Sequence, residues 1–142
     1  MKRAEDFKLE VITPERVLLS QQASSLMLLS SEGGSLGIFP NHAPLIAKVN
    51  AGILKVRDTN KKEKIIFVSR GVIIVSLEGV SILVRSAETK EMIDRERARA
   101  AKERAKKRLV SPDKDVDLQR AREALNRAEY RMKLAGSAPD GD

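Results

Sequence analysis

The stretch Ser86-Ala-Glu-Thr-Lys-Glu-Met-Ile-Asp-Arg-Glu-Arg-Ala98 divides the chain into two halves with different residue patterns. Before it, short runs rich in Val, Ile and Leu are separated by Gly, Pro and Asn, which is typical of strands and turns. After it, nearly every residue is a strong helix former. We therefore expect a sheet domain over residues 1–85 and a helical segment over residues 86–142.

Short apolar runs in the first half predict strands. Turn-forming residues separate the runs, and no helical stretch lies between them. This spacing favours an antiparallel sandwich over a parallel sheet, because a parallel sheet needs helices between its strands. The predicted strands cover residues 7–13, 17–19, 26–29, 36–39, 45–49, 53–56, 64–68, 72–76 and 80–84.

The second half predicts two helices. Asp94 suits the N-cap of the first helix, Ser111-Pro112 ends it, and Ala135-Gly136 ends the second. Small apolar residues recur on both helices at spacings of three and four, so the helices can pair through a seam made mainly of alanine. Such a seam buries little area, and we expect the hairpin to open easily. The predicted fold class is α+β, an N-terminal antiparallel β-sandwich followed by a C-terminal antiparallel two-helix hairpin.

The composition excludes several classes of protein. The 142 residues include no cysteine and one histidine, so neither a disulfide framework nor a structural zinc site is expected. No apolar run approaches the ~20 residues that a membrane helix needs. The N-terminal residues lack the apolar core of a signal peptide. We expect a soluble, cytoplasmic protein that requires no metal.

The charge distribution indicates an anionic partner. The net charge is +7, and residues 95–108 alone carry eight basic and two acidic side chains. Folding the second half about a turn near Pro112 places Arg97 opposite Arg127 and Asp94 opposite Arg131. Two facing guanidinium groups repel each other unless an anion lies between them.

No set of residues predicts catalysis. His42 lies between two prolines, and no second histidine, cysteine or carboxylate pair completes a catalytic or metal-binding set around it. We interpret it as a turn residue whose ring is capped by the backbone. Gly33-Gly34 is followed by neither Lys-Ser nor Lys-Thr, so a P-loop is excluded.

The loop Ser35-Leu-Gly-Ile-Phe-Pro-Asn-His-Ala-Pro-Leu45 resembles a loop of the epsilon subunit of bacterial F-type ATP synthases. Val11-Ile-Thr-Pro14, Val49-Asn-Ala-Gly52 and Ser69-Arg-Gly-Val72 extend the similarity over most of the chain. Ser35 stands where the family often has an acidic residue, and Asn41 stands where it has glycine. The resemblance implies a non-catalytic rotor subunit that helps to couple proton flow to ATP synthesis. The loop that would face the gamma subunit and the membrane c-ring includes Ser35, Pro40, Asn41 and His42.

The segment Ile93-Asp-Arg-Glu-Arg-Ala98 matches the Ile/Leu-Asp-x-x-Arg-Ala motif with which bacillus-type epsilon subunits bind ATP between their C-terminal helices. The resemblance therefore implies ATP as a regulatory ligand. Hydrolysis at this site is not expected, since no metal-binding carboxylate pair or base accompanies the motif. The implied ATP-binding residues are Glu88, Ile93, Asp94, Arg97, Ala98, Arg127 and Arg131.

The same resemblance implies a hairpin that alternates between a compact form on the sandwich and an extended form. The extended form would reach the alpha/beta catalytic head and restrain ATP hydrolysis. The subunit would lie at the cytoplasmic face of the bacterial cell membrane as a peripheral protein, touching the membrane only through the complex. The implied contacts with the head are Arg95, Arg99, Lys102, Arg104, Lys106, Lys107 and Arg108.

Two other functions stay open at this point. A nucleic-acid-binding module could use the basic helices, but only 3% of the residues are aromatic, which leaves little for base stacking. A structural adaptor without a nucleotide site is the second alternative. Titration with nucleotide distinguishes that adaptor from an ATP-binding subunit.

Overall fold

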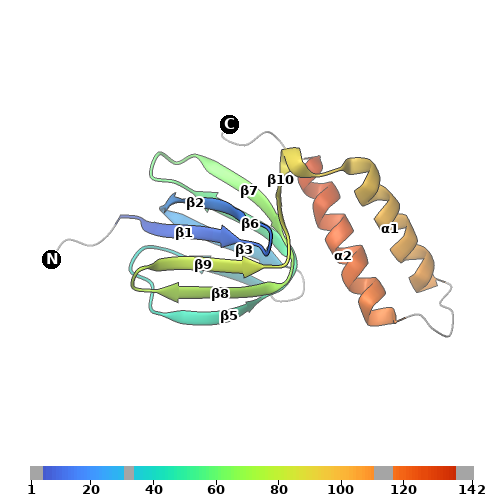
Figure 1. The fold of residues 1–142 in the computed structure, drawn as a ribbon, viewed down its shortest axis with the longest axis horizontal. Coiled ribbons are helices and arrows are strands. Elements are labelled where there is room, and N and C mark those ends of the chain that lie inside the picture. The colour runs from blue at the N-terminus through green and yellow to red at the C-terminus, as the bar shows by residue number, and fades with distance from the viewer. Residues whose placement is uncertain (1–4, 31–33, 111–116, 137–142) are drawn as a thin grey trace.

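The computed structural model describes residues 5–30, 34–110 and 117–136, which form two five-stranded sheets and two α-helices (Figure 1). The first sheet has the order β2 (Val17–Ala23), β1 (Phe7–Ile12), β9 (Gly79–Val84), β8 (Gly71–Ser76) and β5 (Leu45–Val49). The second has the order β10 (Ala87–Thr89), β7 (Glu63–Val68), β6 (Gly52–Arg57), β3 (Ser25–Ser30) and β4 (Gly34–Ile38). A 3₁₀ turn, η1 (Lys90–Met92), leads to α1 (Arg95–Val110) and α2 (Leu118–Ala135). The predicted sandwich and hairpin are confirmed.

The core of the sandwich lies between the two sheets. Successive side chains of a strand point to opposite faces. β1 therefore buries Leu9 and Val11 completely, while the Lys8 side chain, next to Leu9, faces solvent. On the opposing sheet, β6 buries Leu54 and Val56 in the same apolar cluster. This alternation fixes which face of each sheet is internal.

One strand pair differs from the predicted antiparallel pattern. β1 and β9 run parallel, with Leu9 opposite Val80 and Val11 opposite Ile82. These strands are distant in the sequence, so no hairpin turn determines their relative direction. Their direction depends on how the sheet assembles, which the local residue pattern does not encode.

A bent two-stranded ribbon joins the sheets at the end that faces α2 (Figure 1). β8 pairs with β9 in one sheet, and β7 pairs with β10 in the other. Between these pairs, the Arg85 amide donates to the Arg70 carbonyl oxygen at 3.1 Å and the Ser69 amide donates to the Ser86 carbonyl oxygen at 3.0 Å. The sheet therefore continues past residue 85, where the sequence predicted it to end. The sequence did not predict β10, because its three residues are too few to show a strand period.

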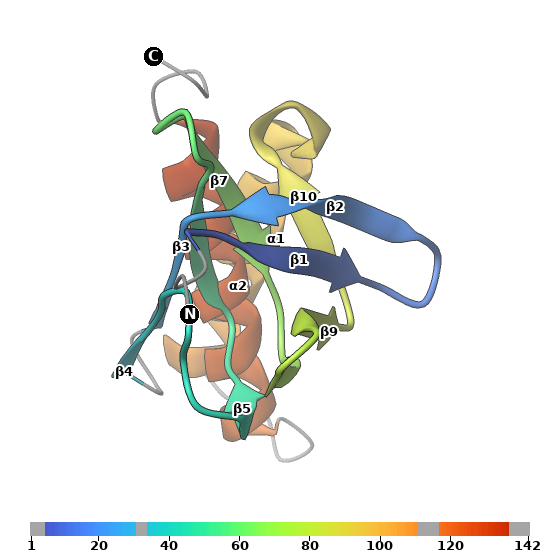
Figure 2. The ribbon, with the colours of Figure 1, turned by 90° about the vertical axis from the view of Figure 1, so that its left-hand side faces the viewer.

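The helical hairpin packs against the outer face of the second sheet. Leu134 and Ala135 of α2 join Ile53 and Phe67 of the sheet in one apolar cluster, which also contains Ile93. α2 lies between the sandwich and α1, and Figure 2 shows both helices behind the strands. The buried residues of α1 are two alanines, Ala98 and Ala105. The predicted alanine seam is therefore present, and it buries little side-chain area.

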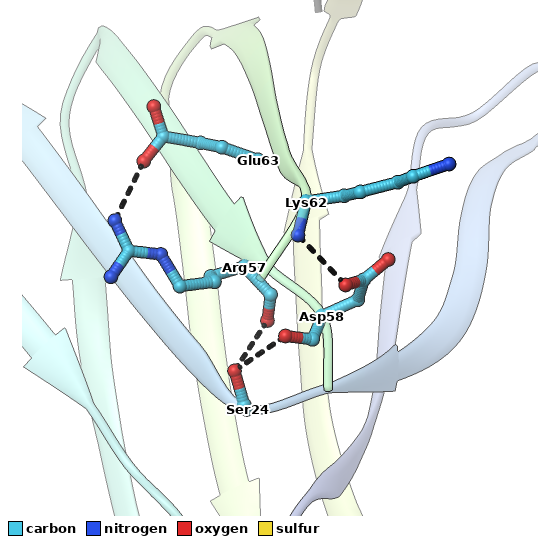
Figure 3. Close-up of polar contacts among 5 residues, drawn as sticks. All are labelled: Ser24, Arg57, Asp58, Lys62 and Glu63. Atoms are coloured by element: carbon cyan, nitrogen blue, oxygen red, sulfur yellow. Dashed lines mark hydrogen bonds and ion pairs between the residues drawn. The ribbon is translucent and has the colours of Figure 1, made fainter. Parts of the chain in front are cut away.

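The far end of the second sheet is held by a polar turn (Figure 3). The Ser24 hydroxyl donates to the carbonyl oxygens of Arg57, at 3.1 Å, and Asp58, at 2.8 Å. The Asp58 carboxylate accepts from the Lys62 amide at 3.0 Å, and Arg57 pairs with Glu63 at 3.5 Å on the surface. These bonds join the β2–β3 connection to the β6–β7 turn, at the end of these strands away from α2.

Candidate functional site

A basic cleft of about 670 Å³ lies between α2 and the sandwich. Residues of the bent ribbon, of the end of β5 and of the β5–β6 connection form one wall, and the first four turns of α2 form the other. Six cationic side chains and two carboxylates contribute to the lining, so the cleft has a positive potential. The charged residues are Lys48, Arg70, Arg85, Asp117, Arg120, Glu123, Arg127 and Arg131.

Glu88 and Arg131 form the closest contact between the hairpin and the sandwich. Arg131 Nε donates to Glu88 Oε1 at 2.7 Å, and the two side chains are only 27% and 21% exposed. The guanidinium carbon of Arg131 also lies 4.5 Å from the centre of the Phe67 ring, in cation–π geometry. Both interactions cross from α2 to the sheet, so they stabilise the docked helix and hold the Arg131 side chain in one orientation.

Arg127 lies one helical turn before Arg131 and lines the cleft. Burial lowers its pKa from the usual arginine value, and the charges of Arg131, Arg70 and Arg120 lower that pKa further, while Glu123 raises it. Arginine stays protonated in proteins, so this lowered pKa means that the positive charge of Arg127 is held in an unfavourable place. A bound anion would relieve that cost.

The contacts of the α2 arginines involve the sandwich as well as the hairpin. Arg127 lines the cleft beside Arg70 of the sandwich, whereas Arg97 does not line it. Arg131 pairs with Glu88 and not with Asp94. The reason is that α2 is the helix that docks on the sandwich, so Arg131 reaches Glu88 and the ring of Phe67.

The Ile93–Ala98 motif residues have local structural roles in the docked form. Ile93 is buried in the cluster with Phe67 and Leu134. Asp94 caps α1, since its Oδ1 accepts from the Arg97 amide at 3.1 Å, as the sequence predicted. Ala98 is buried. Phe67 lies beside predicted ATP-binding residues from both segments. It belongs to the same apolar cluster as Ile93, and the guanidinium group of Arg131 lies over its ring.

The basic residues of α1 are mostly on the surface. Arg99 pairs with Glu96 at 3.1 Å on the same helix, and Lys102 is half-buried. Arg95 is different, because its Nη2 donates to the Ala135 carbonyl oxygen at 2.7 Å. This bond to the last turn of α2 was not predicted, since nothing local in the sequence pairs two positions forty residues apart. The exposed remainder is Arg104, Lys106, Lys107 and Arg108.

The loop between β4 and β5 presents polar and apolar side chains together. Asn41 has a left-handed backbone with φ of 67°, which asparagine tolerates better than most residues and which explains why it can replace glycine there. His42 Nδ1 lies 2.7 Å from the Ala43 carbonyl oxygen, which confirms its interpretation as a turn residue capped by the backbone. Pro40 lies in this loop, whereas Ser35 lies in β4. Phe39 and Leu77, 56% and 92% exposed, line a groove beside it and were not predicted as surface residues.

No group of three or more His, Asp or Glu side chains in residues 5–30, 34–110 and 117–136 could hold a metal ion. Neither α1 nor α2 is long and apolar enough to cross a bilayer.

Comparisons with known proteins cover nearly the whole chain. A family model described as the beta-sandwich domain of the ATP synthase delta/epsilon chain matches residues 6–90, and one described as the long alpha-helix domain matches residues 91–136. The ATP synthase epsilon chain of Moorella thermoacetica is 43% identical over 129 residues, 91% of this chain and 96% of that one. The epsilon chain of Desulforamulus reducens is 38% identical over 90% of this chain and 96% of its own.

The fold is also similar to that of chains in solved ATP synthase structures. A chain in the cryo-EM structure of the Euglena gracilis mitochondrial ATP synthase, OSCP/F1/c-ring in rotational state 1, matches with a TM-score of 0.79 and 25% identity. The match covers 95% of this chain and 84% of that chain. A chain of the central stalk and c-ring of the Tetrahymena thermophila mitochondrial enzyme shares the fold at 19% identity, with a TM-score of 0.55.

Proposed function

The chain belongs to the ATP synthase epsilon chain family, and on that basis we propose that its hairpin regulates ATP hydrolysis and closes on the sandwich when ATP binds. The protein is a non-catalytic central-stalk subunit of an F-type ATP synthase. The observation that carries the proposal is the position of Arg127, a partly buried cation among four other arginines in the cleft between docked helix and sandwich.

Arg131 is central to the described contacts that hold the hairpin on the sandwich. A hydrogen bond between charged groups contributes roughly 1.5–3 kcal/mol, and a cation–π contact contributes about 0.5 kcal/mol when exposed and about 2 kcal/mol when desolvated. Arg131 makes both of these contacts, and Leu134 and Ala135 add a small apolar patch. The docked and released forms therefore differ by an energy that a ligand can reverse.

ATP supplies that energy by binding the docked form only. At a concentration 100 times its dissociation constant, a ligand stabilises the form that it binds by about 2.7 kcal/mol. In this proposal the phosphates contact Arg127 and Arg97, and Glu88 orients Arg131, as it does in the structure. Ile93, Asp94 and Ala98 shape the nucleotide side of the site. ATP is a regulatory ligand here and is not hydrolysed.

The released hairpin acts on the rest of the complex. Residues 86–142 would extend toward the alpha/beta catalytic head and present the exposed cations of α1 to an acidic surface, which restrains hydrolysis. Residues 1–85 would bind the gamma subunit and the c-ring, with the loop at Ser35, Pro40, Asn41 and His42 on that side. The subunit would then be peripheral at the cytoplasmic face of the bacterial cell membrane.

Calorimetric titration of the full chain with ATP tests the proposal. Binding should be accompanied by protection of the hairpin from trypsin. Arg127→Ala should weaken binding and remove the protection, while the sandwich melts as before. Arg57→Ala removes a cation from the far end of the second sheet and is the matched control. Absence of binding heat at millimolar ATP would reject the proposal and favour an adaptor without a nucleotide site.

A further inference from the structure

The sandwich wall of the basic cleft lies outside the Ile93–Ala98 motif, and its residues have no role in the function proposed so far. We propose that this cleft is a polyphosphate-binding site in which Arg70 and Arg85 of the sandwich hold phosphate groups against Arg127 of α2. The inference rests on the proposed function where the polyphosphate is the triphosphate of ATP. Free polyphosphate has the same chemistry and is the other source.

Arg70 and Arg85 lie directly opposite each other on the bent ribbon. The Arg85 amide donates to the Arg70 carbonyl oxygen at 3.1 Å, and the next rung is closed by Ser69 and Ser86. Ser69 is buried, and its hydroxyl oxygen accepts from the Ser86 amide at 2.8 Å, so the backbone that carries both arginines is rigid. Like charges directly opposite each other destabilise a strand pair, and an anion between them would remove that repulsion.

The wall formed by α2 presents three cations at regular helical spacing. Arg120, Arg127 and Arg131 are separated by seven and four residues, so they lie on one face of α2, and all three line the cleft. The first and last are about 16 Å apart along the axis at 1.5 Å per residue. That length suits a chain of linked phosphates better than a single small ion.

The arginines at the centre of the cleft have no carboxylate partner in the described part of the chain. Among residues 5–30, 34–110 and 117–136, Arg70, Arg85 and Arg127 form no ion pair. The two lining carboxylates are engaged locally on α2. Asp117 caps the helix by accepting from the Arg120 amide at 3.1 Å, and Glu123 accepts from Gln119 at 3.3 Å.

The lining favours phosphate over other anionic ligands. Guanidinium groups match phosphate oxygens with two parallel hydrogen bonds, and a cleft of this size is in the range that encloses small molecules. None of the described lining residues is aromatic, so a nucleobase would have no ring to stack on inside the cleft. A base attached to the phosphates would have to lie outside it, toward Phe67 and Ile93.

Calorimetry of the full chain with sodium tripolyphosphate, and separately with ATP, tests the site. Arg70→Gln and Arg85→Gln each remove one cation from exposed positions on the sandwich. Each should weaken tripolyphosphate binding by about tenfold or more, the expected loss for a hydrogen bond between charged groups. Arg57→Gln changes a residue at the end of β6 away from α2 and should bind as wild type does. Thermal melts of all three variants check that the sandwich is folded.

The outcomes separate the two proposals. If wild-type protein binds no tripolyphosphate at millimolar concentration, the cleft is not a polyphosphate site. If wild type binds ATP and both sandwich variants bind ATP and tripolyphosphate equally well, the sandwich wall has no part in binding, and only the ATP regulation stands. If tripolyphosphate depends on Arg70 and Arg85 but ATP does not bind, the cleft takes free polyphosphate, and the ATP proposal fails.

Discussion

Arg95, in the first turn of α1, donates a hydrogen bond of 2.7 Å to the carbonyl oxygen of Ala135, in the last turn of α2. The bond closes the hairpin at the end where the chain leaves the sandwich. It also places a cation at the negative end of the α2 dipole, where charge is stabilising. The residue that the sequence assigned to the catalytic head is thus used inside the docked hairpin, and its contact with the head stays a prediction.

Arg95→Ala should loosen the end of the hairpin. The substitution removes a charged donor from a helix C-terminus, at a cost of about 1–2 kcal/mol. Hydrogen exchange of the last turn of α2 should become correspondingly faster, while exchange in the sandwich stays the same. Arg99→Ala is the matched control, because its pair with Glu96 is exposed and exposed pairs contribute less than about 1 kcal/mol. Equal exchange in both variants would mean that the Arg95 bond does not hold the hairpin.

Glu88→Gln should release α2 from the sandwich more often. The change leaves the partly buried Arg131 without its carboxylate but keeps the size of the side chain, so the docked form loses roughly 1–3 kcal/mol. Limited trypsin digestion should then cleave the hairpin faster in the absence of ligand. Glu63→Gln, which breaks the exposed pair with Arg57, should be digested at the wild-type rate. Unchanged digestion of Glu88→Gln would show that apolar packing alone keeps α2 in place.

Gly71→Ala should destabilise the sandwich strongly. A Cβ at this position would collide with the Leu83 carbonyl oxygen across the β8–β9 ladder, and backbone atoms cannot move aside without breaking the pair. We expect a loss of about 3 kcal/mol or more in the free energy of unfolding, measured by urea denaturation. At Gly136 an added Cβ meets its nearest atom at 3.6 Å, so Gly136→Ala should change stability by less than about 0.5 kcal/mol. Similar values for the two variants would contradict this account.

Charge reversal on α1 should raise ATP hydrolysis by the assembled complex. Lys106→Glu, Lys107→Glu and Arg108→Glu together invert the exposed end of the helix, and the extended hairpin would then be repelled by an acidic surface of the catalytic head. Hydrolysis should be compared at equal subunit content, with Lys62→Glu on the sandwich as the control. Unchanged hydrolysis in a complex that retains the triple variant would reject the charge contact as the source of inhibition.

The local pattern of the sequence was enough to predict most elements of the fold. Short apolar runs separated by turn residues predicted the nine strands from β1 to β9, and apolar residues at spacings of three and four predicted both helices, because burial of side chains imposes such local patterns on the chain. The helix ends were equally local. Asp94 caps α1, and Gly136 ends α2 with its amide donating to the Met132 carbonyl oxygen at 3.1 Å. The predicted stop at Ser111-Pro112 lies outside the described residues.

The ATP-binding set stays a prediction, and its contacts in the docked form could be foreseen only in part. Asp94 caps α1 as expected, whereas the pairing of Arg131 with Glu88 and the position of Arg127 in the cleft were not predicted. A register drawn for two helices alone treats the facing helix as the only neighbour. In the structure the sandwich is a second neighbour of α2. Arg131 pairs with Glu88 of the sheet, and Arg127 lines the cleft together with Arg70.

The sequence by itself determined which segments form strands and helices, how α1 begins and α2 ends, and that the positive charge is concentrated in residues 95–108. The tertiary structure alone decided the parallel pairing of β1 with β9, the continuation of the sheet into β10 and the meeting of Arg70, Arg85 and Arg127. The physical reason is distance along the chain. Hydrophobic period and capping act between residues a few positions apart, whereas these contacts join segments that are distant in the sequence. The pairings of β1 with β9 and of β7 with β10 form when the sandwich assembles, and Arg127 meets Arg70 and Arg85 only when α2 docks on it.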